Sequence, residues 1–168
     1  MTSQINRRNN SNYNIKKRLS LNLRRFVRGK KMRLDNYDNE ILRYIVLSRT
    51  DFREYIEHQF LEGMTWDNYC SVWEIDHIIP VGEFDMANED DLKLCWHYLN
   101  LMPLFRKDNE IKAHSLYFAK IELEKRLNVL PSNPILKALK EKTNNEEIHA
   151  KYNYDLEFLK FYNSIKYH

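Results

Sequence analysis

The sequence predicts a helix-rich α+β domain, and three features of the chain lead to this fold class. Gly and Pro together number only seven of the 168 residues, while 43% of the residues are apolar and 30% are charged. This balance is typical of an ordered chain with many helices. Apolar residues recur at steps of three or four over much of the chain, as in amphipathic helices. One short run, residues 72–79, is instead rich in β-branched residues, ends before Pro80 and predicts a strand.

The positive charge of the chain is concentrated at its N-terminus. Residues 1–34 hold eleven of the 27 Lys and Arg and no acidic residue, so the other sixteen face all 24 acidic residues. Residues 1–14 are polar, rich in Asn and aperiodic, and they predict a flexible arm. Residues 15–32 predict a basic amphipathic helix that ends near Gly29.

Such a segment is typical of polyanion binding, because neutralised phosphates release their counterions. The expected DNA contacts are Lys16, Lys17, Arg18, Arg24, Arg25, Arg28, Lys30 and Lys31. Three alternatives stay open: the helix lies on an anionic membrane, its charges form an ordinary solvated face, or its apolar residues pack into the core.

Helical patterns continue after this segment. Residues 35–47 predict a second helix whose apolar face is formed by Ile41, Leu42, Ile45 and Val46. Ser48 or Thr50 is the expected N-cap of a third helix, whose stripe is Phe52, Tyr55, Ile56 and Phe60, and which Gly63 ends. The remaining expected elements are a connection over 81–91, a helical turn over 92–98, a strand over 100–104, and helices over 107–127, 135–142 and 146–165.

Residues 73–112 carry a set of side chains suited to phosphodiester hydrolysis with one metal ion. A hard cation such as Mg²⁺ prefers oxygen ligands and keeps several waters, so the carboxylate of Asp76 and the amide of Asn109 can hold it. A neutral histidine that titrates near working pH can take a proton from the attacking water. His77 is the candidate for this general base.

This stretch resembles the HNH (ββα-metal) endonucleases, most closely the small ones carried by phages and large DNA viruses. The segments that carry the resemblance are IDHIIP, NLMPL and DNEIK in this order, the step of nine residues from Asn100 to Asn109, and GMTWDNYCSVW upstream. The resemblance covers roughly residues 50–112. No single residue is a strong signal, but the ordered set is.

The resemblance implies a hairpin followed by a helix. Asp76 and His77 would end the first strand, Asn100 would lie on the second strand, and Asn109 and Lys112 would start the helix. It further implies that His77 is the base, that Asp76 and Asn109 hold the metal, and that Asn100 orients the hairpin. Lys112 would meet a phosphate. The large aromatic residues Trp66, Tyr69 and Trp73 would wall this hairpin.

The expected domain plan has three parts. Residues 1–34 form a basic arm and helix, residues 35–130 form an HNH nuclease domain with a ββα-metal core surrounded by helices, and residues 131–168 form a helical extension that packs on the domain or dimerises. Cys70 and Cys95 form no CxxC pair, so no structural zinc is expected. Two free thiols are favoured over a disulfide between them. The chain has no long apolar run and no signal-peptide pattern, so we expect an intracellular protein that is neither secreted nor membrane-bound.

Each candidate residue also has a plainer interpretation. A histidine in an apolar run is often a core side chain, an Asn at a helix start often bonds its own backbone, and Lys112 could be a solvated helix residue. The acidic residues of the connection are Glu83, Asp85, Glu89, Asp90 and Asp91, and we expect exposed positions for them rather than metal sites. His58, His149 and His168 are expected at the surface. His114 is an alternative ligand with a poorer spacing, and His97 only flanks the motif.

The sequence thus predicts an endonuclease that hydrolyses DNA, in double-stranded form, with Mg²⁺, Mn²⁺ or another divalent ion. Its oligomeric state would be a monomer or a homodimer. The main alternative is a non-catalytic nucleic-acid-binding protein with a vestigial motif and an active basic helix. A packaging component that uses the motif as part of a larger motor is a third reading.

Overall fold

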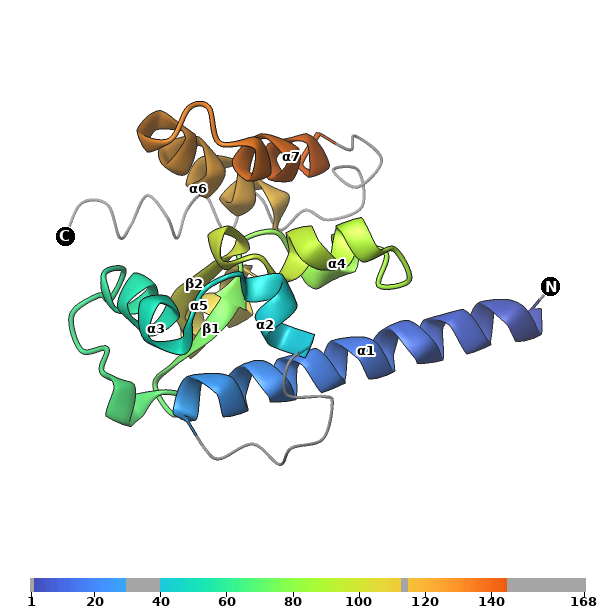
Figure 1. Ribbon diagram of the computed structural model, residues 1–168, viewed down its shortest axis with the longest axis horizontal. Coiled ribbons are helices and arrows are strands. Elements are labelled where there is room, and N and C mark those ends of the chain that lie inside the picture. Colours follow the sequence, from blue (N-terminus) through green and yellow to red (C-terminus); the bar gives the residue numbers. More distant parts are fainter. Residues whose placement is uncertain (1, 30–39, 113–114, 145–168) are drawn as a thin grey trace. The chain divides into compact units, whose positions relative to one another are not determined.

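The structure, a computed structural model, describes residues 2–29, 40–112 and 115–144, with side chains from residue 12 onward. These residues form two compact units, one within residues 1–58 and 84–98 and the other within 59–83 and 99–168. Helices predominate, and the described residues contain one antiparallel sheet of two strands (Figure 1). The expected α+β class is therefore confirmed.

The first unit is made of helices, with its core where their apolar faces meet. Its members are α1 (Thr2–Arg28), α2 (Glu40–Ile45), α3 (Arg49–Glu57) and α4 (Glu89–Trp96). Helix α1 contacts α2 and α3, and α2 contacts α4. On α1 the buried side chains include Leu19, Leu23, Phe26 and Val27. The ring of Phe26 lies 6.0 Å from that of Phe52 in α3, so the basic helix also contributes to the core of its unit.

The expected end of α1 is confirmed, but the expected flexible arm is wrong. The helix ends at Arg28 because Gly29 adopts a φ of +60°, which favours glycine. At its other end it begins at Thr2, although residues 1–14 predicted an aperiodic arm. Residues 2–14 contain neither Pro nor Gly, so a helix whose C-terminal half is held by packing can propagate through them.

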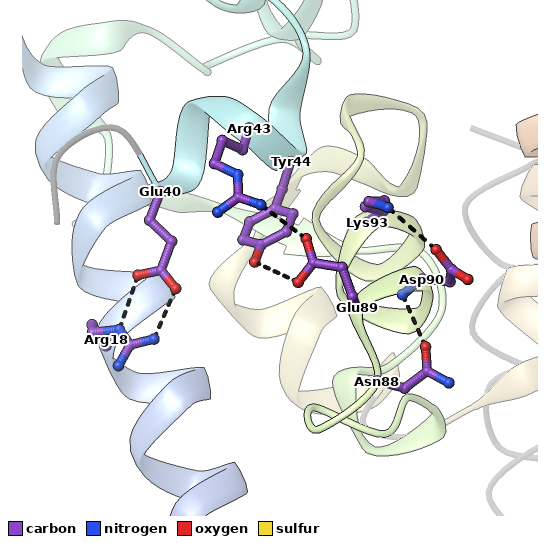
Figure 2. A network of polar contacts seen from close by, with 8 residues as sticks. All are labelled: Arg18, Glu40, Arg43, Tyr44, Asn88, Glu89, Asp90 and Lys93. Carbon is purple, nitrogen blue, oxygen red and sulfur yellow. Dashed lines mark hydrogen bonds and ion pairs between the residues drawn. The ribbon is translucent and has the colours of Figure 1, made fainter. Parts of the chain in front are cut away.

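Charged side chains connect the helices of this unit (Figure 2). Arg18 of α1 donates two hydrogen bonds to the carboxylate of Glu40 at the start of α2, at 3.0 and 2.8 Å. Glu89, at the start of α4, accepts from Arg43 at 3.2 Å and from the hydroxyl of Tyr44 at 3.4 Å. Both acidic residues lie in a first helical turn, where negative charge is favourable.

The second helix differs from expectation in its apolar face, and the third ends at Glu57 rather than near Gly63. Ser48 is the N-cap of α3, as one of the two candidates, and its side chain accepts from the backbone of Asp51. The expected apolar face of α2 is half right, because Ile41 and Ile45 are buried whereas Leu42 is 38% and Val46 60% exposed. Helix α2 ends at Ile45, and Val46 takes a φ of +63°, so the helical period no longer positions its side chain.

The second unit contains the sheet. Strands β1 (Trp73–His77) and β2 (Leu101–Phe105) pair antiparallel, and β2 runs directly into α5 (Arg106–Lys112). Then follow α6 (Leu116–Val129) and α7 (Pro134–Lys142). The expected aromatic wall is confirmed, since the Trp66 and Tyr69 rings lie 5.2 and 4.9 Å from that of Trp73. Phe60 joins them at 4.7 Å from Trp73.

The single helix expected over residues 107–127 is wrong. Helix α5 stops at Lys112, and Ser115 starts α6 as its N-cap by accepting from the backbone of Phe118. A capping Ser satisfies free backbone N–H groups and favours a new helix start over continuation. The break at residues 131–134 is confirmed, with Asn133 as N-cap of α7. The helix expected over residues 146–165 lies outside the described residues.

Candidate functional site

The register of the hairpin places the candidate residues in one unit. Asp76 pairs with Met102 and His77 with Leu101, at the end of β1 where the expected dipeptide falls. Helix α5 contacts both strands, and it carries Asn109 and Lys112 on its turns. Two strands and one helix therefore bring together side chains that are more than thirty residues apart in the sequence.

Lys112 lies inside the fold, with 2% of its side chain exposed. Its ammonium group contacts the Oδ2 of Asp76 and donates to the backbone carbonyl of His77. The ring of Phe118 lies 5.4 Å from the ammonium nitrogen, close enough for a cation–π attraction. The plainer interpretation, a solvated helix lysine, is therefore wrong, and the phosphate contact expected of Lys112 stays a prediction.

Asn109 meets a residue that our sequence reading missed. Its Nδ2 donates to the Oε1 of Glu74 at 2.7 Å. Glu74 and Asp76 are two positions apart on β1, so their side chains lie on the same face of the strand. This alternation was the available signal, because a carboxylate two residues before a candidate ligand must point the same way.

Asn100 is fully buried and links the segment after β1 to the segment before β2. Its side-chain oxygen accepts from the backbone N–H of Ile79 at 2.9 Å, and its carbonyl accepts from that of Ile78 at 2.8 Å. It lies in the 3₁₀ turn η3 (Tyr98–Asn100), immediately before β2 rather than on it. These bonds hold the segment that follows His77, and His77 itself is buried with 8% of its surface exposed.

The donor atoms near α5 are oxygens of the kind that a hard cation prefers. Asp76 uses Oδ2 for Lys112, which leaves its second carboxylate oxygen, and the amide oxygen of Asn109 is the other end of the group that donates to Glu74. Among the described residues, no three His, Cys, Asp or Glu side chains come together as a metal site. A cation here would thus rely on an amide and on water besides carboxylate, as Mg²⁺ often does.

The basic residues of α1 belong to the other unit. Five of the expected DNA contacts are exposed, namely Lys16, Lys17, Arg24, Arg25 and Arg28. Arg18 pairs with Glu40 instead. Lys30 and Lys31 lie outside the described residues. Arg24 and Arg28 follow Lys17 by seven and eleven residues, so the three share one face of the helix. Tyr13 and Leu21, each four residues from Lys17, are 60% and 44% exposed.

Of the expected acidic connection, Glu83 belongs to the second unit and residues 89–91 form the first turn of α4 rather than a loop. Glu89 pairs with Arg43, Asp90 pairs with Lys93 at 3.3 Å, and Asp91 accepts from the backbone of Asp85 at 2.8 Å. Each of these three carboxylates thus has a partner within the protein. Among the other histidines, His58 is exposed as expected, while His114, His149 and His168 lie outside the described residues.

Two ionisable side chains of the first unit carry strongly shifted pKa values. Burial lowers the pKa of His97 to about 4, and burial raises the pKa of the Cys95 thiol well above its usual range. Both Cys95 and Cys70 are free thiols, as expected. None of the described helices combines the length and the apolar character that crossing a bilayer requires.

Similar proteins include two uncharacterized proteins of Acanthamoeba polyphaga mimivirus. One is 35% identical over 91 residues, which is 54% of this chain and 40% of that protein. The other is 38% identical over 58 residues, or 34% of this chain and 26% of that protein. The chain thus spans less than half the length of the curated relatives it matches. No family model and no solved structure matches it.

Proposed function

We propose that this chain is an HNH-type, metal-dependent endonuclease that hydrolyses DNA phosphodiester bonds. His77 is the general base, Asp76 and Asn109 hold one divalent cation, and Asn100 orients the segment after β1. The observation that carries the proposal is the meeting of β1 and α5, where Asp76 contacts Lys112 and the neighbouring Glu74 contacts Asn109.

The reaction follows from the chemistry of these side chains. His77 takes a proton from a water molecule, the water oxygen attacks phosphorus, and the bond to the 3′-oxygen breaks as that oxygen takes up a proton from solvent. This leaves a 5′-phosphate and a 3′-hydroxyl. A bound Mg²⁺ would supply charge neutralisation for the phosphate and the leaving oxygen. His77 is buried, and a neutral imidazole is the form of histidine that can accept a proton.

The buried lysine gives the site a second electrostatic feature. The ammonium of Lys112 offsets one negative charge at Asp76, so a phosphate meets a less negative environment than two bare carboxylates would create. Its bond to the carbonyl of His77 also ties α5 to the end of β1. In this proposal Lys112 supports the site from within.

The basic face of α1 supports the proposal that the substrate is a polyanion. Lys17, Arg24 and Arg28 form an exposed stripe, and residues 2–29 contain no acidic residue. A row of cations on one helix face suits the sequence-independent contacts by which proteins hold a DNA backbone. Double-stranded DNA is the substrate that we propose.

Incubating the purified protein with supercoiled plasmid tests the activity. We expect nicked or linear product with Mg²⁺ or Mn²⁺, no product with EDTA, and strongly reduced product for Asp76→Ala. Glu110→Gln, on the exposed side of α5, is the matched control and should cleave like the wild type. Cleavage that survives both EDTA and Asp76→Ala would refute the proposal.

A non-catalytic nucleic-acid-binding protein is the second candidate. It is favoured by the contact between Lys112 and Asp76, because an internal ammonium already neutralises the carboxylate that should hold the cation. This candidate predicts DNA binding without any cleavage and no Mn²⁺ binding at Asp76. A gel shift together with a Mn²⁺ titration of the same preparation separates the two functions.

A further inference from the structure

The bond between Asn109 and Glu74 has a chemical direction. It joins α5 to β1 across 35 positions of the sequence, in a partly buried setting, with a length of 2.7 Å from Nδ2 to Oε1. An ionised carboxylate only accepts hydrogen bonds, whereas a side-chain amide has a donating end and an accepting end. Glu74 therefore selects the NH₂ end of Asn109.

This selection matters for any cation at the site. Only the oxygen of an amide can bind a hard cation, and rotation of the amide by half a turn would present the NH₂ group instead. A side-chain amide held by no partner can adopt both orientations. A carboxylate that accepts from the NH₂ group excludes the orientation in which this group would face the cation, as hydrogen-bond partners of metal ligands commonly do.

We propose that Glu74 is a positioning residue that fixes the amide of Asn109 with its oxygen available to the cation. The inference rests on the proposed function, since it assumes that a divalent ion binds at Asp76 and Asn109. Glu74 acts through Asn109, and its own Oε1 is engaged by the amide. The same bond gives Glu74, the first of the two acidic residues of β1, a partner on α5.

The chain allows an isosteric test of this bond. Glu74→Gln leaves two amides facing each other, so the orientation of Asn109 is no longer dictated. Combining Glu74→Gln with Asn109→Asp restores one amide and one carboxylate with donor and acceptor exchanged, and keeps the net charge of the wild type. Glu110→Gln on the exposed side of α5 makes the same chemical change without a contact to the amide.

We expect Mn²⁺ affinity, measured by titration calorimetry, to fall about 10- to 100-fold in Glu74→Gln. The double variant should recover most of this loss, and Glu110→Gln should lose none. In the metal-free protein, the side-chain NH₂ resonances of Asn109 should shift on Glu74→Gln while thermal melts stay similar, a readout independent of cleavage.

The outcomes separate this inference from the function that it rests on. Wild-type affinity in Glu74→Gln, or a double variant no better than the single one, overturns the positioning role while Mn²⁺ still binds. Wild-type protein that binds no Mn²⁺ and cleaves no plasmid overturns the proposed function, and the positioning role with it. Unmoved NH₂ resonances of Asn109 would show that the hydrogen bond to Glu74 is not formed in solution.

Discussion

The ammonium group of Lys112 contacts the carboxylate of Asp76 from the inside of the fold. Lys112 is 2% exposed and the side chain of Asp76 is 21% exposed, so the pair spans the boundary between the core and the surface. A buried ammonium without its partner is costly, and so is a half-buried carboxylate. The pair therefore couples the fold of the hairpin and helix to the residue that we propose as a metal ligand.

Replacing Lys112 should destabilise the protein. We expect Lys112→Met to lower the free energy of unfolding by about 2–4 kcal/mol, because it leaves the carboxylate of Asp76 without its charge partner. Urea unfolding at pH 7 measures the effect. Lys107→Met, at an exposed position of the same helix, is the control and should change the stability by less than about 0.5 kcal/mol. Equal effects of the two substitutions would contradict the assignment of Lys112 as the buried charge partner of Asp76.

Replacing His77 should separate cleavage from binding. His77→Ala should reduce plasmid cleavage about 10²- to 10⁴-fold, the usual loss when a positioned general base is removed. Binding to a DNA duplex in a gel shift should stay within a factor of about three. The exposed His58→Ala is the control. Because His77 is buried, circular dichroism must show an intact fold, and undiminished cleavage in the folded variant would remove it from the mechanism.

The exposed stripe of α1 should govern the salt dependence of DNA binding. Replacing Lys17 and Arg24 by Gln should weaken affinity for a duplex and lower the slope of log K against log[salt] by up to about 1.8, or about 0.9 for each lost phosphate contact. Fluorescence anisotropy at several salt concentrations gives the slope. Lys125→Gln with Lys137→Gln removes the same charge elsewhere, and an equal drop there would mean that the effect is general electrostatics.

His97 should make stability fall with acidification. Its folded pKa of about 4 lies below the ordinary value of about 6.5. As the pH drops, His97 therefore binds its proton at a higher pH in the unfolded chain than in the folded one. This contribution to stability is complete above about pH 6.5 and is lost as the pH falls towards 4. We expect about 1–2 kcal/mol less stability at pH 5 than at pH 7, and a smaller loss in His97→Phe. Identical pH profiles of stability for the wild type and His97→Phe, measured by urea unfolding, would rule out this role of His97.

The two cysteines should differ in reactivity. Cys95 is fully buried with a raised pKa, whereas Cys70 is partly exposed. Thiolates are the reacting species, so Ellman's reagent should label Cys95 on the order of 100-fold more slowly than Cys70 in the folded protein. Cys70→Ser should leave only the slow phase, and urea should abolish the difference. Equal rates without urea would place Cys95 at the surface in solution.

Local patterns in the sequence were enough for much of the fold. The β-branched run before Pro80 became β1, the glycine at position 29 ended α1, and Ser48 capped α3, since each depends on neighbours along the chain. The errors arose where a local pattern allowed two outcomes. Residues 107–127 read as one helix, yet the cap at Ser115 divides them, and the polar stretch before residue 15 joined a helix already held by packing.

The candidate site shows the same division. Asp76, His77 and Asn109 could be selected from their residue types, and Asn100 and Lys112 from the resemblance to the HNH endonucleases. Their mutual contacts depended on the antiparallel register and on the packing of α5 against the strands. Glu74 as partner of Asn109 and the burial of Lys112 therefore came only from the tertiary structure. Hydrogen bonds and desolvation act between atoms close in space, and for residues 35 positions apart that closeness is decided by the folded chain.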